Sequence, residues 1–182
     1  MRALVPIADG TEEMEAVIVI DTLRRARWSV TVAAVGAGRE ITASRGVRIT
    51  ADVLLEAVDD DTFDAIVLPG GAAGAEAFMA SARLTVLLQD QARAGRLVAA
   101  ICAGPLALQA AGLLTGRAAT CHPAVADALT VTARRTERVV VDGNLITSQG
   151  PGTAFEFALA IIRHQAGDAA AQRVAAGLVL PD

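Results

Sequence analysis

Cys102 is the residue of this sequence whose type and position best fit covalent chemistry. It lies in LVAAICAGPLALQAAGLL (residues 97–114), where an apolar run meets Ala-Gly-Pro and then a second apolar run. This order predicts a strand that turns at once into a helix, a geometry that exposes a nucleophile at the turn. The positive end of that helix would lower the pKa of the thiol from about 8.5 to between roughly 3.5 and 7.5. The alternative is an inert core residue, because free cysteines are among the most buried residues.

Glu15 is the carboxylic acid best placed to assist such a thiol. TEEME opens the first predicted helix, where Glu12 and Glu13 have the positions of ordinary N-terminal helix charges. Glu15 lies one position beyond Met14, beside the predicted apolar face, where a carboxylate is costly unless it is paired or protonated. A protonated Glu15 would donate a hydrogen bond to a Cys102 thiolate and keep it ionised. The alternative for Glu15 is a solvated helix charge.

The segment TCHP holds the second cysteine and the first of two histidines. Neighbouring side chains in a strand point to opposite faces, so Cys121 and His122 would not both face Cys102. If His122 faces the site and acts as a base, Cys121 belongs to the core and a Cys102–Cys121 disulfide is disfavoured. His164 lies near a predicted helix C-terminus, where it stabilises the helix and needs no catalytic role.

Two glycines end the predicted buried strand FDAIVLPGG (63–71). The spacing in LPGGAAGAE differs from the G-x-G-x-x-G fingerprint of dinucleotide sites. We interpret Gly70 and Gly71 instead as backbone that approaches a substrate oxygen closely and supplies half of an oxyanion hole. The N–H of Ala103, directly behind the nucleophile, would supply the other half.

The composition excludes several classes of protein. The chain has 182 residues, of which 53% are hydrophobic and 20% charged, and this predicts one folded domain over residues 1–182. It contains no lysine and no tyrosine, which excludes Schiff-base enzymes, lysine-dependent P-loop NTPases and Tyr-Lys dehydrogenases. Two histidines argue against a histidine-rich metal site, and we expect neither a metal nor a cofactor. The net charge of −4 gives no general attraction to nucleic acid or anionic lipid.

The N-terminal apolar run is too short for a signal peptide, and no apolar stretch reaches the length of a membrane span. With two cysteines and no export signal, a disulfide framework is not expected. We therefore expect a cytoplasmic protein that is not bound to a membrane.

Strands and helices alternate around these residues. Thr11 is the expected N-cap of the first helix, and Met14, Val17, Ile18 and Leu23 are expected near one face of it. Strands are expected at 2–8, 29–35, 63–71, 96–101 and 118–123, a bent pair of short strands at 41–50, and an antiparallel arrangement of 131–135 and 138–148. Helices are expected at 11–28, at 75–95 with a break near Ser81, from Cys102 to Leu114, at 153–165 and at 169–179.

The sum of these elements is an α/β sandwich with a mostly parallel sheet and helices on both faces. Binding sites in such sheets form beyond the carboxyl ends of the strands. Gly10, Gly70, Cys102 and His122 all follow the ends of predicted strands. The sequence therefore places the candidate residues at one edge of the sheet.

Several of these segments, in this order, resemble the ThiJ/PfpI superfamily, and more narrowly its branch with the Parkinsonism-associated protein deglycase and bacterial relatives. The resemblance runs essentially end to end. It implies a flavodoxin-like three-layer sandwich, a homodimer, and a redox-sensitive nucleophile at Cys102 that is hydrogen-bonded to protonated Glu15. The segments are EEMEAVIVIDTLRRA, ASRGVRI, VLPGG, VAAICAGP, CHP, TSQGPGTAFEFALAI and the tail LVLPD.

The resemblance also implies roles for other residues. His122 matches the family's nearby histidine, and Gly71 and Ala103 match its backbone oxyanion groups. Arg45 matches an arginine that reaches the partner subunit's site across the dimer, and Arg25 matches another arginine near that anion pocket.

This sequence departs from the family pattern at three positions. The protease-like branch has histidine directly after the cysteine, whereas Ala103 stands here, so peptidase activity is disfavoured. Gln149 stands where some members carry arginine, which is expected to change how anionic substrates bind. Cys121 beside His122 is a third variation, and the sequence assigns it no effect.

The leading functional hypothesis is a cofactor-free cysteine enzyme that acts on reactive dicarbonyls such as methylglyoxal, or on early glycation adducts through the same intermediate. The second hypothesis is a redox sensor or stress chaperone that responds to oxidation of Cys102 to a sulfinic acid. The third is a non-catalytic dimeric domain in which Cys102 is buried.

Overall fold

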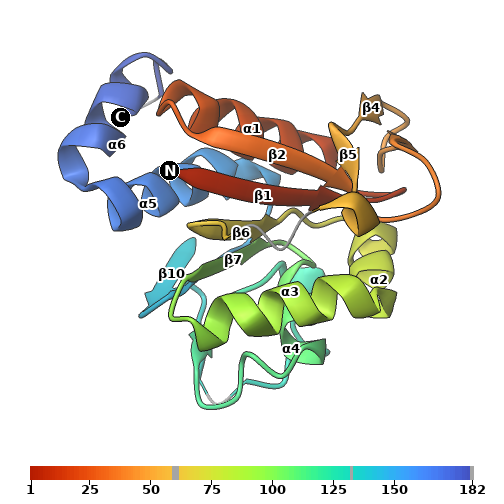
Figure 1. The fold of residues 1–182 in the computed structure, drawn as a ribbon. Helices are drawn as coiled ribbons and strands as arrows, with labels where there is room; N and C mark the ends of the chain where they lie inside the picture. Colours follow the sequence, from red (N-terminus) through yellow and green to blue (C-terminus); the bar gives the residue numbers. More distant parts are fainter. Residues whose placement is uncertain (59–61, 132, 181–182) are drawn as a thin grey trace.

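The computed structural model describes residues 1–58, 62–131 and 133–180. Within these ranges one seven-stranded sheet has the order β10-β11-β7-β6-β1-β2-β5 (Figure 1). Every neighbouring pair is parallel except β10 and β11, which are antiparallel. The strands are β1 (Arg2–Ile7), β2 (Ser29–Ala34), β5 (Val53–Leu54), β6 (Ala65–Leu68), β7 (Leu97–Ile101), β10 (Val139–Asp142) and β11 (Leu145–Ser148).

Helices cover both faces of this sheet, so the expected flavodoxin-like α/β sandwich is confirmed (Figure 1). On one face lie α1 (Glu13–Arg25), α5 (Ala154–Ala166) and α6 (Asp168–Ala176), and on the other α2 (Ala72–Ala80), α3 (Ala82–Arg93) and α4 (Pro105–Ala110).

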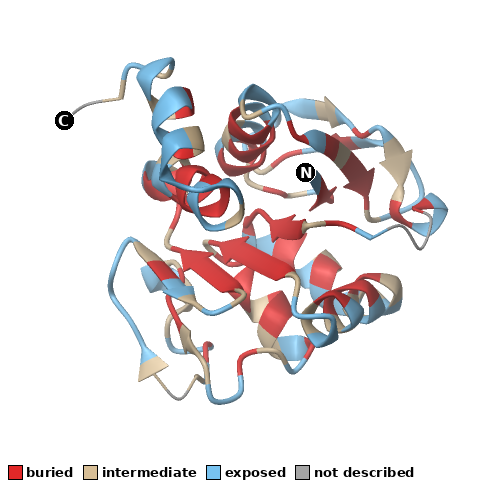
Figure 2. Ribbon diagram, turned by 60° about the vertical axis from the view of Figure 1, so that its left-hand side comes forward, coloured by how far each residue is buried: buried red, intermediate tan, exposed pale blue. Residues whose placement is uncertain are grey.

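Two hydrophobic cores lie between the sheet and these layers of helices. Successive side chains of a strand point to opposite faces, so Val5 and Ile7 of β1 pack under α1 while Leu4 packs toward α3. Figure 2 shows that the central strands are almost wholly buried and that the helices turn exposed residues outward. Parallel strands between two layers of helices are buried on both faces, which explains why their sequences are apolar runs without alternation.

Two small two-stranded sheets flank the main sheet. β3 (Glu40–Thr42) and β4 (Arg48–Thr50) are the pair of short strands that the sequence predicts around Arg45-Gly46, and they pair antiparallel. β8 (Ala118–Ala119) pairs in parallel with β9 (Ala133–Arg134), so β9 is not the antiparallel partner of β10.

The strand predicted at 118–123 is wrong beyond its second residue. Pro123 opens a short 3-10 helix, η2 (Pro123–Val125), because a proline has no N–H for a strand ladder and suits a helical turn. Three segments were not predicted: β5 and the 3-10 helices η1 (Leu55–Ala57) and η3 (Pro151–Thr153). Thr132, within the predicted strand 131–135, and Pro181-Asp182 of the LVLPD tail lie outside the described residues.

The N-cap of α1 is Glu12, not Thr11. A carboxylate oxygen of Glu12 accepts the N–H of Glu15 at 2.7 Å, which satisfies one of the free donors of the first helical turn. Thr11 is buried, and its hydroxyl instead accepts the N–H of Ala8 at 2.9 Å. Thr11 therefore stabilises the loop between β1 and α1, and Glu12 caps the N-terminus of α1.

The predicted face of α1 is also partly wrong. Met14 and Val17 are exposed to 54% and 50%, whereas Glu13 and Glu15 are buried with the apolar residues of the helix. The expected break near Ser81 is confirmed, since this residue ends α2 and its hydroxyl accepts the N–H of Leu84 at the start of α3.

Candidate active site

Cys102 directly follows β7 and has a left-handed backbone conformation, with φ of 64°. Residues other than glycine rarely adopt this conformation, and they keep it only where the surroundings enforce it. The N–H of Cys102 donates to the carbonyl of Ser148 on β11 at 3.0 Å, and its carbonyl accepts the N–H of His122, also at 3.0 Å. Hydrogen bonds on both sides therefore hold the strained turn that the sequence predicts.

Gly104 allows this turn to pack against the end of β6. A Cβ at this position would lie 2.9 Å from the carbonyl oxygens of Ile101 and Leu68. Contacts of this length do not occur for a Cβ, so only glycine fits between the two strand ends. In the sequence Gly104 is only a turn signal, and nothing local indicates this packing role.

Glu15 reaches Cys102 from the first turn of α1. It is fully buried, and its Oε2 accepts the N–H of Gly70 at 2.7 Å. The carboxyl group also lies beside the Cys102 thiol, and each group affects the pKa of the other. Oε1 is buried and has no hydrogen-bond partner in the described part of the chain. The structure thus brings the candidate acid and the candidate nucleophile into direct contact.

Burial raises the pKa of Glu15 to about 7, because the hydrogen bond from Gly70 and the effect of the Cys102 thiol only partly offset the loss of solvation. Burial also raises the pKa of the Cys102 thiol to about 12, and the negative charge of Glu15 adds to this shift. The N–H groups of Gly71 and Ala103 lower the pKa of the thiol but do not outweigh these causes.

The expectation of a thiol with a lowered pKa is therefore wrong. α4 is only six residues long, and the half-buried sulfur lies beside an acid that is itself desolvated. Once the pair has lost one proton, its negative charge resides mainly on the Glu15 carboxylate, because the pKa of Glu15 is far below that of the thiol.

A cavity of about 320 Å³ opens above the sulfur. Its wall combines the Cys102 elbow and Ala103 with Gly71, Arg45 and His122, so residues from separate parts of the chain meet around one space. This cavity lies at the carboxyl ends of β6 and β7, as the sequence predicts.

Gly70 and Gly71 bring their backbone against the nucleophile. A Cβ on Gly70 would lie 2.5 Å from the Cβ of Cys102 and 2.8 Å from Oε2 of Glu15. Gly71 has φ of 89°, and a Cβ there would lie 2.1 Å from the carbonyl oxygen of Gly10. The N–H groups of Gly71 and Ala103 both reach the sulfur, an arrangement that can stabilise negative charge.

His122 lies in the cavity wall, but one of its ring nitrogens is already engaged. Nδ1 accepts the N–H of Ala124 at 3.1 Å. In the neutral ring the hydrogen is then on Nε2, which makes His122 a donor rather than a base. The Cδ2 edge faces Gly150, where a Cβ would lie at 3.1 Å.

Cys121 is not in a strand, but it still belongs to the core. It is buried among the residues under α3 and α4, whereas Cys102 packs against the core on the opposite face of the sheet. Both cysteines are free, and their side chains lie on opposite sides of the sheet.

Arg45 lines the cavity of its own chain. That it reaches the site of a partner subunit, as the resemblance implies, stays a prediction. Its backbone N–H donates to Glu13 at 2.8 Å, and the hydroxyl of Ser44 donates to the other oxygen of the same carboxylate at 2.7 Å. Desolvation alone would raise the pKa of Glu13, but these hydrogen bonds outweigh it and lower the pKa. Glu13 is thus a positioning residue that sequence reasoning missed, because Ser44 is 31 residues away and no local pattern joins them.

Two other predicted residues lie outside this cavity. Arg25 is at the C-terminal end of α1, where it pairs with Asp21 at 2.5 Å and lines a different cavity. The side-chain amide of Gln149 donates to the carbonyl of Thr136 at 2.7 Å and does not line the cavity. The expected effect of Gln149 on anionic substrates has no contact to support it.

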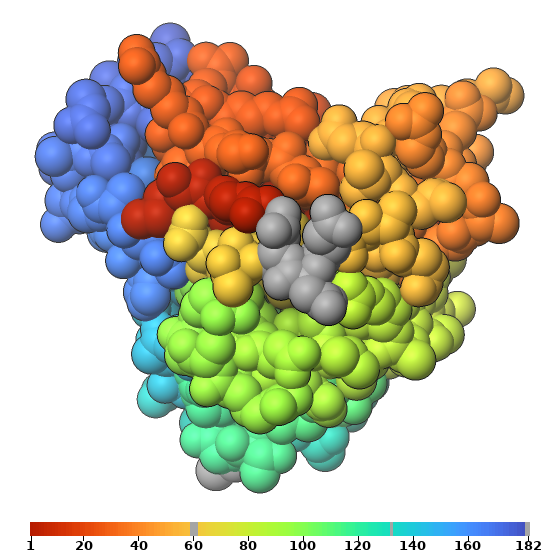
Figure 3. Space-filling model, in the orientation of Figure 1, coloured from red at the N-terminus to blue at the C-terminus, as the bar shows by residue number. Residues whose placement is uncertain are grey.

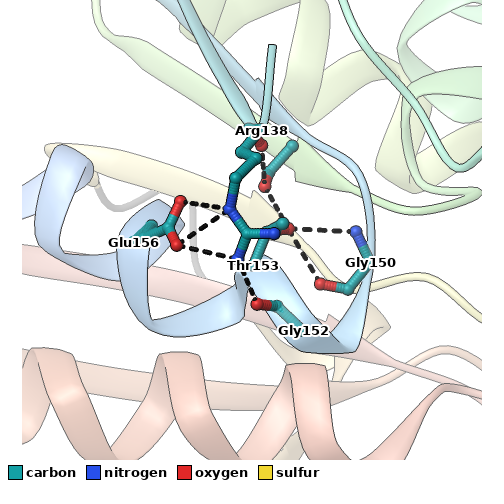
Figure 4. A network of polar contacts seen from close by, with 6 residues as sticks. Arg138, Gly150, Gly152, Thr153 and Glu156 are labelled. Atoms are coloured by element: carbon teal, nitrogen blue, oxygen red, sulfur yellow. Dashed lines mark hydrogen bonds and ion pairs between the residues drawn. The ribbon is translucent and has the colours of Figure 1, made fainter. Parts of the chain in front are cut away.

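A polar network supports the elbow from the side of β11 (Figure 4). The hydroxyl of Ser148 donates to the carbonyl of Arg138 at 2.6 Å and shares a second hydrogen bond of 2.6 Å with Thr153. Thr153 in turn accepts the N–H of Gly150 at 3.1 Å. The guanidinium of Arg138 makes a forked ion pair with Glu156 at 2.8–2.9 Å. The network connects the residue before β10 with β11 and the start of α5.

The part of the chain that the structure describes contains no group of three histidine, cysteine, aspartate or glutamate residues that could hold a metal ion. Among the same residues, no helix is both long and apolar enough to cross a membrane.

Comparison with known proteins gives a consistent result. The sequence profile of the DJ-1/PfpI family matches residues 1–164. Protein DJ-1 homolog B of Arabidopsis thaliana is 54% identical over 88% of this chain, which spans 37% of the length of that relative. Glutathione-independent glyoxalase DJR-1.2 of Caenorhabditis elegans is 40% identical over 87% of this chain and 84% of its own length. The solved structure of oxidized Toxoplasma gondii DJ-1 superposes with a TM-score of 0.96 at 43% identity, over 100% of this chain and 99% of that one.

Proposed function

Because this chain belongs to the DJ-1/PfpI family, we propose that it is a cysteine-dependent enzyme that converts methylglyoxal-type dicarbonyls to 2-hydroxyacids without glutathione. The observation that carries the proposal is the buried Glu15 carboxyl beside the Cys102 thiol beneath the cavity, with the pKa of Glu15 at about 7. The glyoxalase name of the nematode relative supports the same class of substrate.

In the first step Glu15 acts as general base. The thiol proton of Cys102 passes to the carboxylate as the sulfur bonds to the aldehyde carbon of the substrate. A base with a pKa near the working pH is effective in this role, since enough of it is ionised and its affinity for the proton is still high. The sulfur does not need a low pKa of its own, because proton transfer and attack occur at one site.

The N–H groups of Gly71 and Ala103 stabilise the oxygen that becomes negative in the resulting hemithioacetal. Glu15 returns the thiol proton to this oxygen, which becomes a hydroxyl, and is ionised again. It then accepts the proton of the former aldehyde carbon and returns it to the neighbouring carbon, while the hydroxyl proton passes to the second oxygen. The first carbon is oxidised and the second reduced, so no external oxidant or reductant is needed. The product is a 2-hydroxyacyl thioester.

Water hydrolyses this thioester, which releases lactate and restores the thiol. In the overall reaction, methylglyoxal and one water molecule become lactate. The cavity of about 320 Å³ accommodates a substrate of this size. Arg45 and the Nε2–H of His122 can donate hydrogen bonds to the second carbonyl group from the cavity wall.

The test is lactate formation from methylglyoxal in the absence of glutathione. We expect Cys102→Ser to abolish turnover and Glu15→Gln to reduce kcat at least ~100-fold, the usual contribution of a general base. Cys121→Ala is the matched control and should keep wild-type turnover, since its thiol lies on the other side of the sheet. Full activity of Cys102→Ser would rule out the covalent mechanism.

Deglycation of early adducts on proteins or nucleotides is the hydrolase form of the same proposal. The Cys102 sulfur would displace the amine from the hemiaminal carbon of the adduct, and the amine would leave with the thiol proton. The resulting hemithioacetal would rearrange to the same thioester. Release of the free amine together with lactate, at a rate that exceeds spontaneous reversal of the adduct, distinguishes this activity from removal of free methylglyoxal.

A redox sensor or stress chaperone that responds to oxidation of Cys102 is the second candidate. The Toxoplasma gondii relative is known in an oxidized form, and the Cys102 sulfur here is partly exposed. The raised pKa of the thiol makes oxidation slow unless Glu15 takes up its proton. Intact mass after mild peroxide treatment, measured beside dicarbonyl turnover, separates the two functions.

We further propose that the chain forms a homodimer through a groove between α1 and β4, half of whose lining residues are apolar and half polar or charged. Val17, Ile20 and Ile49 line this groove, and Met14 and Val47 are exposed apolar residues of α1 and of the loop before β4. Exposed apolar surface of this kind is typical of interfaces. Two free cysteines are typical of a reducing compartment, so we also propose a cytoplasmic location.

A further inference from the structure

A second cavity, separate from that of Cys102, lies between the C-terminal end of α1 and α6. Its volume is about 630 Å³, against about 320 Å³ for the Cys102 cavity. The two cavities share no lining residue. Figure 3 shows the two segments, orange and blue, meeting at the upper left of the molecule. We propose that this cavity binds a phosphorylated small molecule through three arginines: Arg25, Arg27 and Arg173.

The charge of the cavity is one-sided. Three of its seven lining residues are arginines and none is acidic, although the whole chain has a net charge of −4. Arg25 is paired with Asp21 through its Nε. In the described part of the chain, Arg27 and Arg173 have no hydrogen bond or ion pair from their guanidinium groups. Two guanidinium groups are therefore available to a ligand.

Helix stabilisation accounts for only part of this cluster. Arg25 and Arg173 lie in the last turns of α1 and α6, where a positive charge stabilises the helix dipole. Arg27 lies beyond the end of α1, so the same explanation does not extend to it.

Arg27 also occupies a backbone position that favours glycine. Its φ is 63°, its N–H donates to the carbonyl of Arg24, and the next N–H, of Trp28, donates to that of Leu23. This is a Schellman turn with arginine at the left-handed residue, where glycine is by far the commonest choice. The strained residue makes no side-chain hydrogen bond or ion pair within the described chain, so the fold itself gives its guanidinium no partner.

The chemistry of the lining selects the class of ligand. Guanidinium groups match the geometry of phosphate oxygens and bind them through paired hydrogen bonds. Ala26, Ala170 and Val174 form an apolar wall beside the arginines. Together they fit a diphosphate attached to an apolar or ring portion, and a volume of this size is within the range of small-molecule sites.

The experiment is calorimetric titration of the full chain with inorganic pyrophosphate at constant ionic strength. We expect one saturable site per chain. Arg27→Gly and Arg173→Gln should each raise the Kd at least ~10-fold, as expected for loss of a charge-assisted hydrogen bond. Arg27→Gly is the sharper variant because glycine relieves the left-handed strain, so its Tm should equal or exceed that of the wild type.

Arg93→Gln is the matched control, since it removes one arginine from the last turn of α3 on the other face of the sheet. It should leave the Kd within about twofold of the wild type. Cys102→Ser should bind pyrophosphate as the wild type does, whether or not the proposed enzyme activity exists. The inference is overturned if no saturable binding is found, if Arg27→Gly binds normally, or if Arg93→Gln weakens binding as much as Arg173→Gln.

Discussion

The Glu15 carboxyl loses its contact with water when the chain folds, and this burial favours its uncharged form. Its pKa rises from 4.5 to about 7, so the folded protein holds a proton here over a pH range in which the unfolded chain has released it. Below pH 4.5 both states are protonated and Glu15 imposes no penalty. As the pH rises through the folded pKa, the favourable uncharged form is lost and the fold carries a buried negative charge.

We therefore predict that Glu15 destabilises the fold by about 3 kcal/mol more at pH 8 than at pH 4.5. The measurement is urea unfolding of wild type and Glu15→Gln across this range, with the difference between the two free energies of unfolding plotted against pH. The free energy of unfolding of Glu15→Gln should increase relative to that of the wild type as the pH rises. The midpoint of this change should lie between pH 4.5 and about 7. A difference that does not change with pH would show that Glu15 is ordinarily solvated.

Gly70 is the residue on which the contact between Cys102 and Glu15 depends. We predict that Gly70→Ala destabilises the protein by about 1–3 kcal/mol and slows turnover more than tenfold, because its Cβ would overlap Cys102 and the Glu15 carboxyl. Gly38→Ala is the control for loss of glycine, since its Cβ would meet nothing within 4 Å and its backbone is not left-handed. Normal turnover and normal thermal unfolding of Gly70→Ala would contradict the close approach.

At the scale of elements, the sequence predicts the central strands because parallel strands between two layers of helices are apolar on both sides. It does not predict β5 or the parallel pairing of β8 with β9, since strands of two residues carry too little pattern. The phase of α1 was missed for a different reason. Glu13 and Glu15 are buried against distant partners, and no local pattern shows that a carboxylate has such a partner.

In the candidate site, too, the features set by local sequence can be predicted and those set by distant parts of the chain cannot. The elbow at Cys102 and the backbone of Gly70 and Gly71 are predictable because local chemistry forces their conformations. The raised pKa of the thiol is not, since it depends on how deeply the folded chain buries the sulfur. The places of Arg25 and Arg45 also depend on the path of the whole chain.

The network around η3 contains both an exposed ion pair and buried hydrogen bonds, and we expect them to contribute differently to stability. Arg138 and Glu156 are about half exposed, so their ion pair should contribute little to the free energy of unfolding despite its forked geometry. Thr153 is buried and bonds with Ser148 and Gly150, so Thr153→Val should cost about 1–3 kcal/mol. Chemical unfolding of Thr153→Val and of Glu156→Gln tests this order, and a larger loss in Glu156→Gln would reverse it.

At the scale of the whole molecule, the proposed homodimer places apolar residues of α1 against a second copy. We predict that Val17→Arg shifts the protein to monomers in sedimentation velocity, because a charge would have to be buried in the interface. Val86→Arg is a matched control, since Val86 is similarly exposed (46%) but lies on α3, on the other face of the sheet. A Val17→Arg protein that remains dimeric would place the interface elsewhere, as would a monomeric wild type.

The pH dependence of Cys102 alkylation tests the central claim most directly. If Cys102 and Glu15 share one proton, the rate in the wild type should rise with an apparent pKa near 7 and then level off, because the reactive form appears as the pair loses its first proton. In Glu15→Gln that inflection should vanish, and the rate at pH 7 should fall at least ~10-fold, since the thiol must then ionise alone. The account is contradicted if both proteins inflect at the same pH, or if the wild type shows only the pKa of an ordinary thiol, about 8.5.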